Sequence, residues 1–197
     1  MRLLLASKSE ARRRMLENAG VPFTIVDAPF DEEEAKAGLI ASGFEPRDLA
    51  EMLAELKAKS VSAGPGDLVL GSDQTLELDD GDLLGKAVSR AEMRDQLRVM
   101  SGRTHRLHSA AVAVAGGERL WSAVESVAMT MRPLGAAFLD AYLDREYEAV
   151  RWNVGGYRIE GMGAQLFEHI DGSHFAILGL PLLPLLDFLR ERGPLAS

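Results

Sequence analysis

Residues 3–16 read Leu3-Leu4-Leu5-Ala6-Ser7-Lys8-Ser9-Glu10-Ala11-Arg12-Arg13-Arg14-Met15-Leu16, and this stretch indicates the fold. The continuous apolar run at its start predicts a strand buried on both faces, as in a sheet covered by helices. Ser9 is a typical N-cap, so we expect a helix over residues 10–18, ended by Gly20. A buried strand that leads directly into a helix predicts an α/β fold.

The rest of the chain alternates expected strands and helices, with one longer antiparallel section around the turn at Gly116-Gly117. This order predicts a mixed sheet in a single domain over residues 1–197, with no clear linker. The glycine-rich residues 154–163 are expected to form a binding loop rather than part of the core. The further strands are expected at 21–26, 68–73, 106–114 and 120–131, and the further helices at 46–63, 89–100, 134–143 and 182–192.

Composition bounds the possible partners and the cellular compartment. At 197 residues and 47% hydrophobic, the chain can bury a sizeable core. Its formal net charge of −8 argues against polymeric nucleic acid and anionic membranes as partners. The absence of cysteine excludes disulfides and thiolate metal sites. The apolar runs near both ends are too short for a signal peptide or a membrane span, so we expect a cytoplasmic protein.

The turn after the first expected strand has the features of an anion site. Free backbone N–H groups and the helix dipole would both face a ligand there. Ser7 and Ser9 add hydroxyl donors, and Lys8, Arg12 and Arg13 can neutralise phosphate charge. An ordinary capped helix with a solvated basic face would show the same pattern, and the residues alone leave both interpretations open.

A pair of carboxylates suggests a metal site. Asp73 ends the apolar run 68–73, at the position where α/β sheets tend to place ligands. Mg²⁺ is commonly bound by one or two carboxylates together with substrate phosphates. Glu32, in the acidic stretch 31–34, is a second candidate ligand. A turn-capping aspartate and a solvated acidic face are the alternatives.

Further cations and one polar segment could contact an anionic ligand. Lys57 and Lys86 would stabilise charge on a triphosphate as point charges, although most lysines are simply solvated. Residues 101–105, Ser-Gly-Arg-Thr-His, are by default a helix C-terminus with its glycine cap. They could instead place Arg103 and Thr104 against a ligand.

Several common sites are absent from the sequence. His105 and His108 are three apart on an expected strand and would point to opposite faces, and no histidines show the spacing of a metalloprotease, so no zinc site is expected. There is no Walker A sequence, no G-x-G-x-x-G after a strand and no G-x-S-x-G elbow. The residues alone leave open a nucleotide hydrolase and a binding module.

Several segments, taken together and in order, resemble the Maf family of nucleotide pyrophosphatases. Residues 5–16 resemble the family's L-A-S-x-S-x-x-R-R-x-x-L loop, and residues 53–58 resemble its L-A-x-x-K-A helix. Its metal-site strand and lysine are similar to Gly71-Ser72-Asp73-Gln74 followed by Leu84-Gly85-Lys86. The set is completed by residues 101–105, 156–161 and 179–182, so the resemblance covers nearly the whole chain.

The resemblance implies an elongated α/β fold with flanking helices and two lobes around a deep nucleotide-binding cleft, often as a homodimer. It implies hydrolysis of a nucleoside triphosphate to the monophosphate and pyrophosphate, with Mg²⁺ or Mn²⁺. Glu32 and Asp73 would bind the metal, one of them would help to orient or deprotonate the attacking water, and Glu160 would lie near the base or that water. The residues expected to hold or contact the substrate are Ser7, Ser9, Arg12, Arg13, Lys57, Gln74, Lys86, Arg103 and Thr104.

The resemblance also bears on the base. The group that prefers dTTP and UTP usually carries Ala-Asp-Thr where this chain has Ser-Asp-Gln at residues 72–74. That group also usually has glutamine at the position of Glu160 and arginine at the position of Ala11. The pattern here is similar to the group that prefers 7-methyl-GTP, which we expect as the substrate of a house-cleaning enzyme. The alternative is dTTP or UTP.

The sequence departs from the family pattern at two positions. Glu10 and Ala87 stand where proline is usual, and both changes could loosen local geometry because proline fixes φ. We expect activity to be reduced rather than lost. A rival interpretation is a non-catalytic nucleotide-binding regulator of septum formation, but the presence of both carboxylates and both lysines favours an enzyme.

Overall fold

The computed structural model describes residues 1–195 as two compact units. The first unit comprises Met1–Gln74, Ser109–Glu125 and the chain from Ser173 onward, and the second comprises Thr75–His108 and Ser126–Gly172. Three of the crossings between the units fall inside strands rather than in a linker. No helix of the described chain is long and apolar enough to span a membrane.

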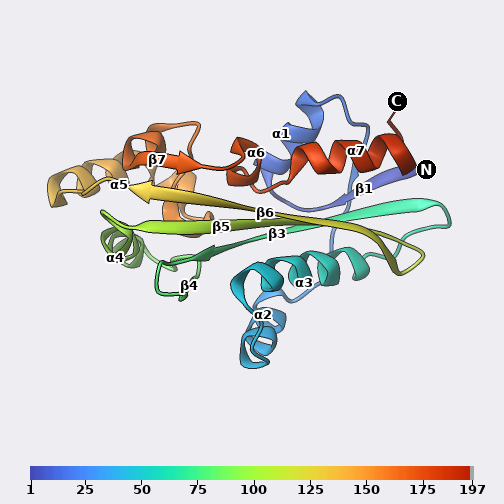
Figure 1. Ribbon diagram of the computed structural model, residues 1–197, viewed down its shortest axis with the longest axis horizontal. Coiled ribbons are helices and arrows are strands. Elements are labelled where there is room, and N and C mark those ends of the chain that lie inside the picture. The colour runs from blue at the N-terminus through green and yellow to red at the C-terminus, as the bar shows by residue number, and fades with distance from the viewer. Residues whose placement is uncertain (196–197) are drawn as a thin grey trace. The chain divides into compact units, whose positions relative to one another are not determined.

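The strands form one seven-stranded mixed sheet (Figure 1), which confirms the expected α/β class. Its order is β2-β1-β3-β5-β6-β7, and β4 pairs with β3. β1 is parallel to both β2 and β3, whereas β4 and β7 run antiparallel to their neighbours. The strands are β1 (Arg2–Ala6), β2 (Thr24–Ile25), β3 (Asp67–Glu77), β4 (Leu83–Leu84), β5 (Thr104–Ala115), β6 (Glu118–Met131) and β7 (Phe167–Asp171).

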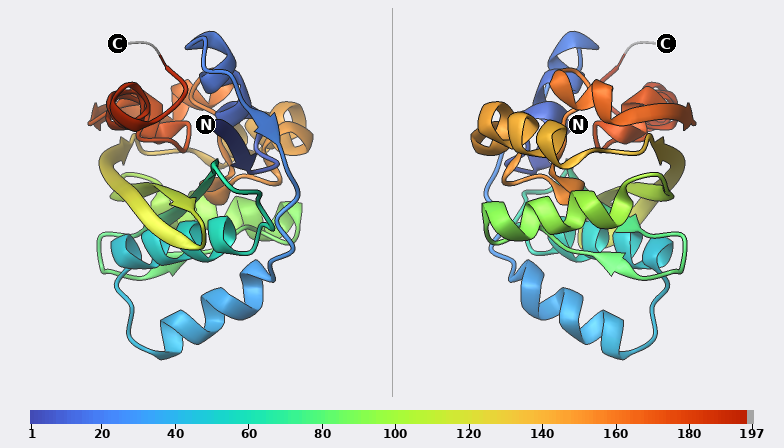
Figure 2. Two further views of the ribbon diagram at one scale, coloured as in Figure 1. Left: turned by 90° about the vertical axis from the view of Figure 1, so that its right-hand side faces the viewer. Right: turned by 90° about the vertical axis from the view of Figure 1, so that its left-hand side faces the viewer.

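In the first unit, helices cover both faces of the sheet, as the apolar run at residues 3–6 predicts. Leu3 and Leu5 pack with α1 (Glu10–Asn18) and α7 (Leu182–Arg192), whereas Leu4 packs on the other face with α3 (Pro46–Lys59). Alternate residues of a strand point to opposite faces, so one strand supplies both cores. Figure 2 shows α2 (Glu32–Ala41) on the far side of α3 from the sheet.

In the second unit, α4 (Arg90–Met100) packs against α5 (Ala136–Val150) and against the 3₁₀ turn Val154–Gly156, and a second 3₁₀ turn, Met162–Leu166, lies against β7. The start of the segment 154–163 is part of the packed interior, whereas Arg158, Glu160 and Gly161 are exposed, so for that exposed part the binding loop stays a prediction. Gly155, Gly156 and Tyr157 are buried. A Cβ on Gly155 would lie 2.6 Å from the Tyr157 ring, so the glycines here serve close packing as well as positive φ.

Several element boundaries differ from the expected ones. The helix expected over 46–63 ends at Lys59, the strand expected over 68–73 continues to Glu77, and that expected over 21–26 shrinks to two residues. The sequence did not predict α2, β4, β7 or the short helix α6 (His174–Ile177). α2 buries none of its residues and therefore carries no apolar period. It begins instead at Asp31, whose side chain caps the helix.

Gly71 sets how closely α3 approaches the sheet. A Cβ at this position would lie 2.1 Å from the Ala54 carbonyl oxygen and 2.8 Å from the Ala58 amide nitrogen, and backbone atoms cannot swing away. We expect Gly71→Ala to destabilise the fold by about 3 kcal/mol, measured by urea unfolding. Gly38→Ala, inside α2, is the control because a Cβ there would have no atom within 4 Å. This substitution should stabilise the fold by about 0.5–1 kcal/mol. Equal stability of the two variants would contradict this packing.

Candidate functional site

The turn between β1 and α1 is held by its own serines. Ser9 caps the helix, since its Oγ accepts a hydrogen bond from the Arg12 amide at 3.4 Å. The Ser9 amide donates to the Ser7 Oγ at 3.2 Å. An open hollow of about 440 Å³ lies against this turn and is lined by Ser7, Lys8, Ser9, Glu10, Arg13 and Ile25. The N-terminus of α1 therefore borders a space large enough for phosphate groups.

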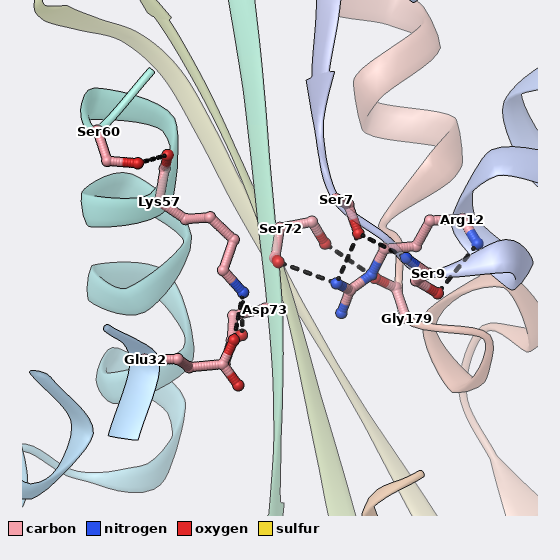
Figure 3. A network of polar contacts seen from close by, with 9 residues as sticks. All are labelled: Ser7, Ser9, Arg12, Glu32, Lys57, Ser60, Ser72, Asp73 and Gly179. Carbon is pink, nitrogen blue, oxygen red and sulfur yellow. Dashed lines mark hydrogen bonds and ion pairs between the residues drawn. The ribbon is translucent and has the colours of Figure 1, made fainter. Parts of the chain in front are cut away.

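Arg12 is fastened by the backbone around it (Figure 3). Its Nε donates to the Gly179 carbonyl oxygen at 2.8 Å, and its Nη1 donates to the Ser72 carbonyl oxygen at 2.9 Å and to the Ser7 Oγ at 3.4 Å. Burial lowers the pKa of the Arg12 guanidinium, and the charge of Asp73 partly opposes that shift. The group still remains protonated, as arginine does in proteins.

Arg13 lines the hollow, unlike Arg12, which is bonded to backbone carbonyl groups. It forms ion pairs with Glu10 at 3.8 Å and with Glu17 at 3.6 Å, and 42% of its side chain is exposed. Its Nε has no hydrogen-bond partner in the described chain. Glu10 lies in the first turn of α1, where a negative charge is favourable to the helix dipole, and pairs with Arg14.

Besides the turn with its serines and arginines, a second cluster consists of one lysine in contact with two carboxylates. The Lys57 Nζ lies 2.7 Å from the Glu32 Oε2 and 3.0 Å from the Asp73 Oδ1. These residues come from α3, from the first position of α2 and from β3, and only 13% of the Lys57 side chain and 10% of the Asp73 side chain are exposed. The structure therefore brings together both carboxylates expected to bind metal and one of the two expected lysines.

Asp73 was expected at the end of a strand, and that position is wrong. It lies inside β3, which continues to Glu77 because β4 pairs with its last residues. The parallel partner β1 ends at Ala6, opposite Gly71. It is the neighbouring strand that ends here, and this places the turn at Ser7 beside the middle of β3.

The two clusters lie on opposite sides of β3, because successive residues of a strand point to opposite faces. Figure 3 shows Asp73 directed toward Lys57 and Glu32, and Ser72 on the side of Arg12. Gln74 returns to the side of Ser72, where its Nε2 donates to the Ser109 Oγ at 2.7 Å. The same Nε2 lies 3.0 Å from the Ala176 carbonyl oxygen, so this amide nitrogen, expected to contact substrate, is bonded within the protein.

The carboxylate pair fits a hard divalent cation. Two acidic oxygens converge on one positive charge, which is the Lys57 ammonium. No group of three or more His, Cys, Asp or Glu side chains within residues 1–195 could hold a metal ion. Mg²⁺ needs no such cage, because it is commonly held by one or two carboxylates with waters and substrate phosphates. Glu32 and Asp73 are therefore suited to a metal that arrives with its substrate.

Four expected site residues belong to the second unit. Arg103 is bonded to Asp79 and, at 2.9 Å, to Asp80, and these hydrogen bonds lower the pKa of both carboxyl groups. The Thr104 hydroxyl lies 2.8 Å from that of Thr130. The remaining two are Lys86 and Glu160, both exposed. No hydrogen bond or ion pair of the Glu160 side chain occurs in the described chain.

Two histidines of β5, to which the sequence assigned no role, are buried. The His105 Nε2 lies 2.7 Å from the Tyr157 hydroxyl, and the Nδ1 and Nε2 of His108 lie 2.7 Å and 2.8 Å from Ser126 and Glu77. Sequence reasoning also missed Gly179, which acts through its carbonyl oxygen and therefore has no side-chain signal. Its only mark in the sequence is its place in the segment 179–182.

Comparison with known proteins gives consistent results over nearly the full chain. The sequence model of the Maf-like protein family matches residues 2–192. A nucleoside triphosphate pyrophosphatase of Caulobacter vibrioides is 50% identical over 97% of this chain and 96% of its own length. One of Paramagnetospirillum magneticum is 50% identical over 98% and 99%, and a 7-methyl-GTP pyrophosphatase of Brucella suis is 47% identical over 97% and 96%.

Burial of His105 predicts a loss of stability at mildly acidic pH. Desolvation lowers its pKa from 6.5 to about 4, so in this range the unfolded chain binds a proton that the folded chain does not. Stability from this residue is complete above pH 6.5 and falls as the pH drops toward 4. We expect urea unfolding to show about 2 kcal/mol lost through His105 between pH 7 and pH 5. His105→Gln should lack this loss, and His169→Gln, at an exposed position, should retain it. The same loss in both variants would exclude His105 as its source.

Proposed function

The chain belongs to the Maf family, and on that premise we propose that it hydrolyses 7-methyl-GTP between the α- and β-phosphates. It is a nucleoside triphosphate pyrophosphatase, a hydrolase that acts on phosphoanhydride bonds and releases a nucleoside monophosphate and pyrophosphate. The identity of the base and the roles of individual residues belong to the proposal.

The observation that carries the proposed mechanism is the contact of Lys57 with Glu32 and Asp73, at 2.7 and 3.0 Å. Both carboxylates can accept a proton, and Asp73 is positioned by a strand rather than by a loop. We assign Asp73 to orient and deprotonate the attacking water, and Glu32 to share the metal. A divalent ion held by these two carboxylates would neutralise charge on the phosphate oxygens. Lys57 adds a fixed positive charge at the same place.

The turn after β1 supplies the phosphate contacts in this proposal. Ser7, Ser9 and Arg13 line the hollow at the N-terminus of α1. Arg12 has used its Nε and Nη1 on protein acceptors, which leaves its Nη2 for a phosphate oxygen. A guanidinium locked in this way is already ordered, so binding costs less conformational entropy. Lys86, Arg103 and Thr104 are proposed as further substrate contacts.

The proposed setting is the cytoplasm, where nucleoside triphosphates are made and consumed. The formal net charge of −8 disfavours long anionic partners such as nucleic acid or an acidic membrane. A single nucleotide is different, because it can be bound by a local cluster of cations. A homodimer is part of the proposal and is tested by the mass in solution.

The chemistry is tested by pyrophosphate release from dTTP, UTP, CTP, GTP, ATP and 7-methyl-GTP, each with Mg²⁺, Mn²⁺ or EDTA. We expect metal-dependent release that is strongest with 7-methyl-GTP. Asp73→Asn should lower the rate about 100-fold or more, since general-base catalysis contributes at least that much. Asp48→Asn, on the exposed part of α3, is the matched control and should keep the wild-type rate.

The outcomes of this experiment separate chemistry from base preference. Release that is strongest with dTTP or UTP would overturn only the proposed preference for 7-methyl-GTP. Full activity in EDTA would overturn the proposed dependence on a divalent metal. An Asp73→Asn variant as active as the wild type would remove Asp73 from catalysis. No release from any nucleotide would favour a binding protein that regulates septum formation.

The preference for 7-methyl-GTP is supported by one exposed carboxylate. Methylation at N7 gives guanine a positive charge, and Glu160 is an acidic residue with no ion pair in the described chain. The relative from Brucella suis is named for 7-methyl-GTP, whereas those that are 50% identical carry the general name. The carboxylate therefore carries this part of the proposal.

Glu160→Gln keeps the shape of the side chain and removes its charge. We expect the ratio of 7-methyl-GTP to GTP turnover, as kcat/KM, to fall about tenfold, which corresponds to about 1.4 kcal/mol. Glu168→Gln, another exposed acid of the second unit, should leave the ratio unchanged. An equal fall with both nucleotides would instead assign Glu160 to catalysis.

A further inference from the structure

Trp152 is the only exposed aromatic residue between residues 1 and 195, with a relative exposure of 70%. It lies two residues beyond the end of α5 in the second unit. The other tryptophan, Trp121, is stacked on Phe188 at a ring distance of 5.1 Å. A single exposed apolar side chain is common in proteins, so exposure alone indicates no ligand. The contacts of Trp152 and of its neighbours do indicate a ligand.

The ring of Trp152 already accepts a cation. The Arg151 guanidinium lies over it, 4.6 Å from the ring centroid. Tryptophan has the aromatic face that attracts positive charge most strongly. Arg151 also pairs with Glu148 at 3.1 Å, on the last turn of α5. The guanidinium occupies one face of the ring, and the high exposure of Trp152 leaves the other face accessible to a planar ligand.

The backbone that carries Trp152 is anchored in the interior. Just before it Val150 is fully buried, and just after it the Asn153 Nδ2 donates to the Tyr157 carbonyl oxygen at 3.1 Å. The Tyr142 hydroxyl donates to the Gly156 carbonyl oxygen at 3.0 Å. The side chain is therefore presented from a fixed base, which lowers the entropy lost when a ligand is bound.

The same segment carries the carboxylate of Glu160. Its neighbour Arg158 is paired with Glu146 at 3.2 Å, whereas Glu160 has no partner in the described chain. A carboxylate accepts two parallel hydrogen bonds, and guanine offers two adjacent N–H donors on its Watson–Crick edge. One aromatic face and one acceptor pair within nine residues match a guanine whose ring is positively charged.

We propose that Trp152 stacks on the 7-methylguanine base and is a specificity-determining residue, with Glu160 accepting hydrogen bonds from the edge of the same base. This inference rests on the proposed substrate. Stacking between a base and an aromatic side chain contributes to binding for any base, and the charge of the methylated ring adds a cation–π attraction that neutral guanine lacks. Trp152 therefore discriminates the methylated nucleotide from GTP.

Kinetics give the first test. Trp152→Ala should raise the KM for 7-methyl-GTP about tenfold and that for GTP about threefold, with kcat changed less than twofold. Trp152→Phe should recover most of the loss because it restores an aromatic face. Leu183→Ala, which truncates an exposed apolar residue of α7, is the control and should change neither KM. Unfolding in urea checks that all variants are folded.

Fluorescence gives a second test that does not depend on turnover. In Trp121→Phe the only tryptophan is Trp152, and stacking on 7-methyl-GMP should quench its emission in a saturable way. In Trp152→Phe the remaining Trp121 should not be quenched. The titration uses the reaction product without metal, so neither hydrolysis nor a paramagnetic ion interferes.

The outcomes distinguish this inference from the proposed function. Preferential turnover of 7-methyl-GTP with no quenching of Trp152 and an unchanged KM in Trp152→Ala would overturn the inference and leave the function intact. Saturable quenching without preferential turnover would overturn the substrate and leave the stacking intact. A change in mass by light scattering in Trp152→Ala, with KM unchanged, would assign the residue to a subunit interface and would also overturn the inference.

Discussion

The contact of Lys57 with Glu32 and Asp73 is the constraint on which the rest of the site depends. Two carboxylates that face the same point in a partly buried place repel each other, and the ammonium group offsets this repulsion. The contact also positions α2, which buries none of its own residues. Removing the lysine would leave two uncompensated charges and a helix with little apolar contact to hold it.

That contact in turn requires α3 to lie close to β3. The Gly71 backbone is packed against Ala54 and Ala58 with no room for a Cβ, and Lys57 lies between these two residues on the same helix. Two residues further along β3, Asp73 returns to the same face and meets it. The missing side chain at Gly71 is thus part of what brings the charged groups together.

How far the sequence predicts this structure depends on how local each feature is. The helix capped by Ser9 and the strands on either side of Gly116-Gly117 follow from short patterns, and the structure has them. α2 was not predicted because a helix without a buried face has no apolar period. The prediction that Asp73 ends its strand was wrong, because the strand that ends beside the site is β1 and not β3, the strand of Asp73. Pairing between distant segments leaves little trace in either one.

The arginines show why residue type alone does not assign a role. Arg12 and Arg13 are adjacent cations beside the same serines, and the sequence treats them alike. In the structure, Arg12 bonds two backbone carbonyl groups and lies on the far side of β3 from Lys57, whereas Arg13 lines the hollow and keeps its Nε without a hydrogen bond. Arg12 uses part of its hydrogen-bonding capacity to hold the turn after β1 in place. Arg13 pairs with Glu10 and Glu17 and is partly exposed beside the hollow, and this difference arises because consecutive residues of a helix face different directions.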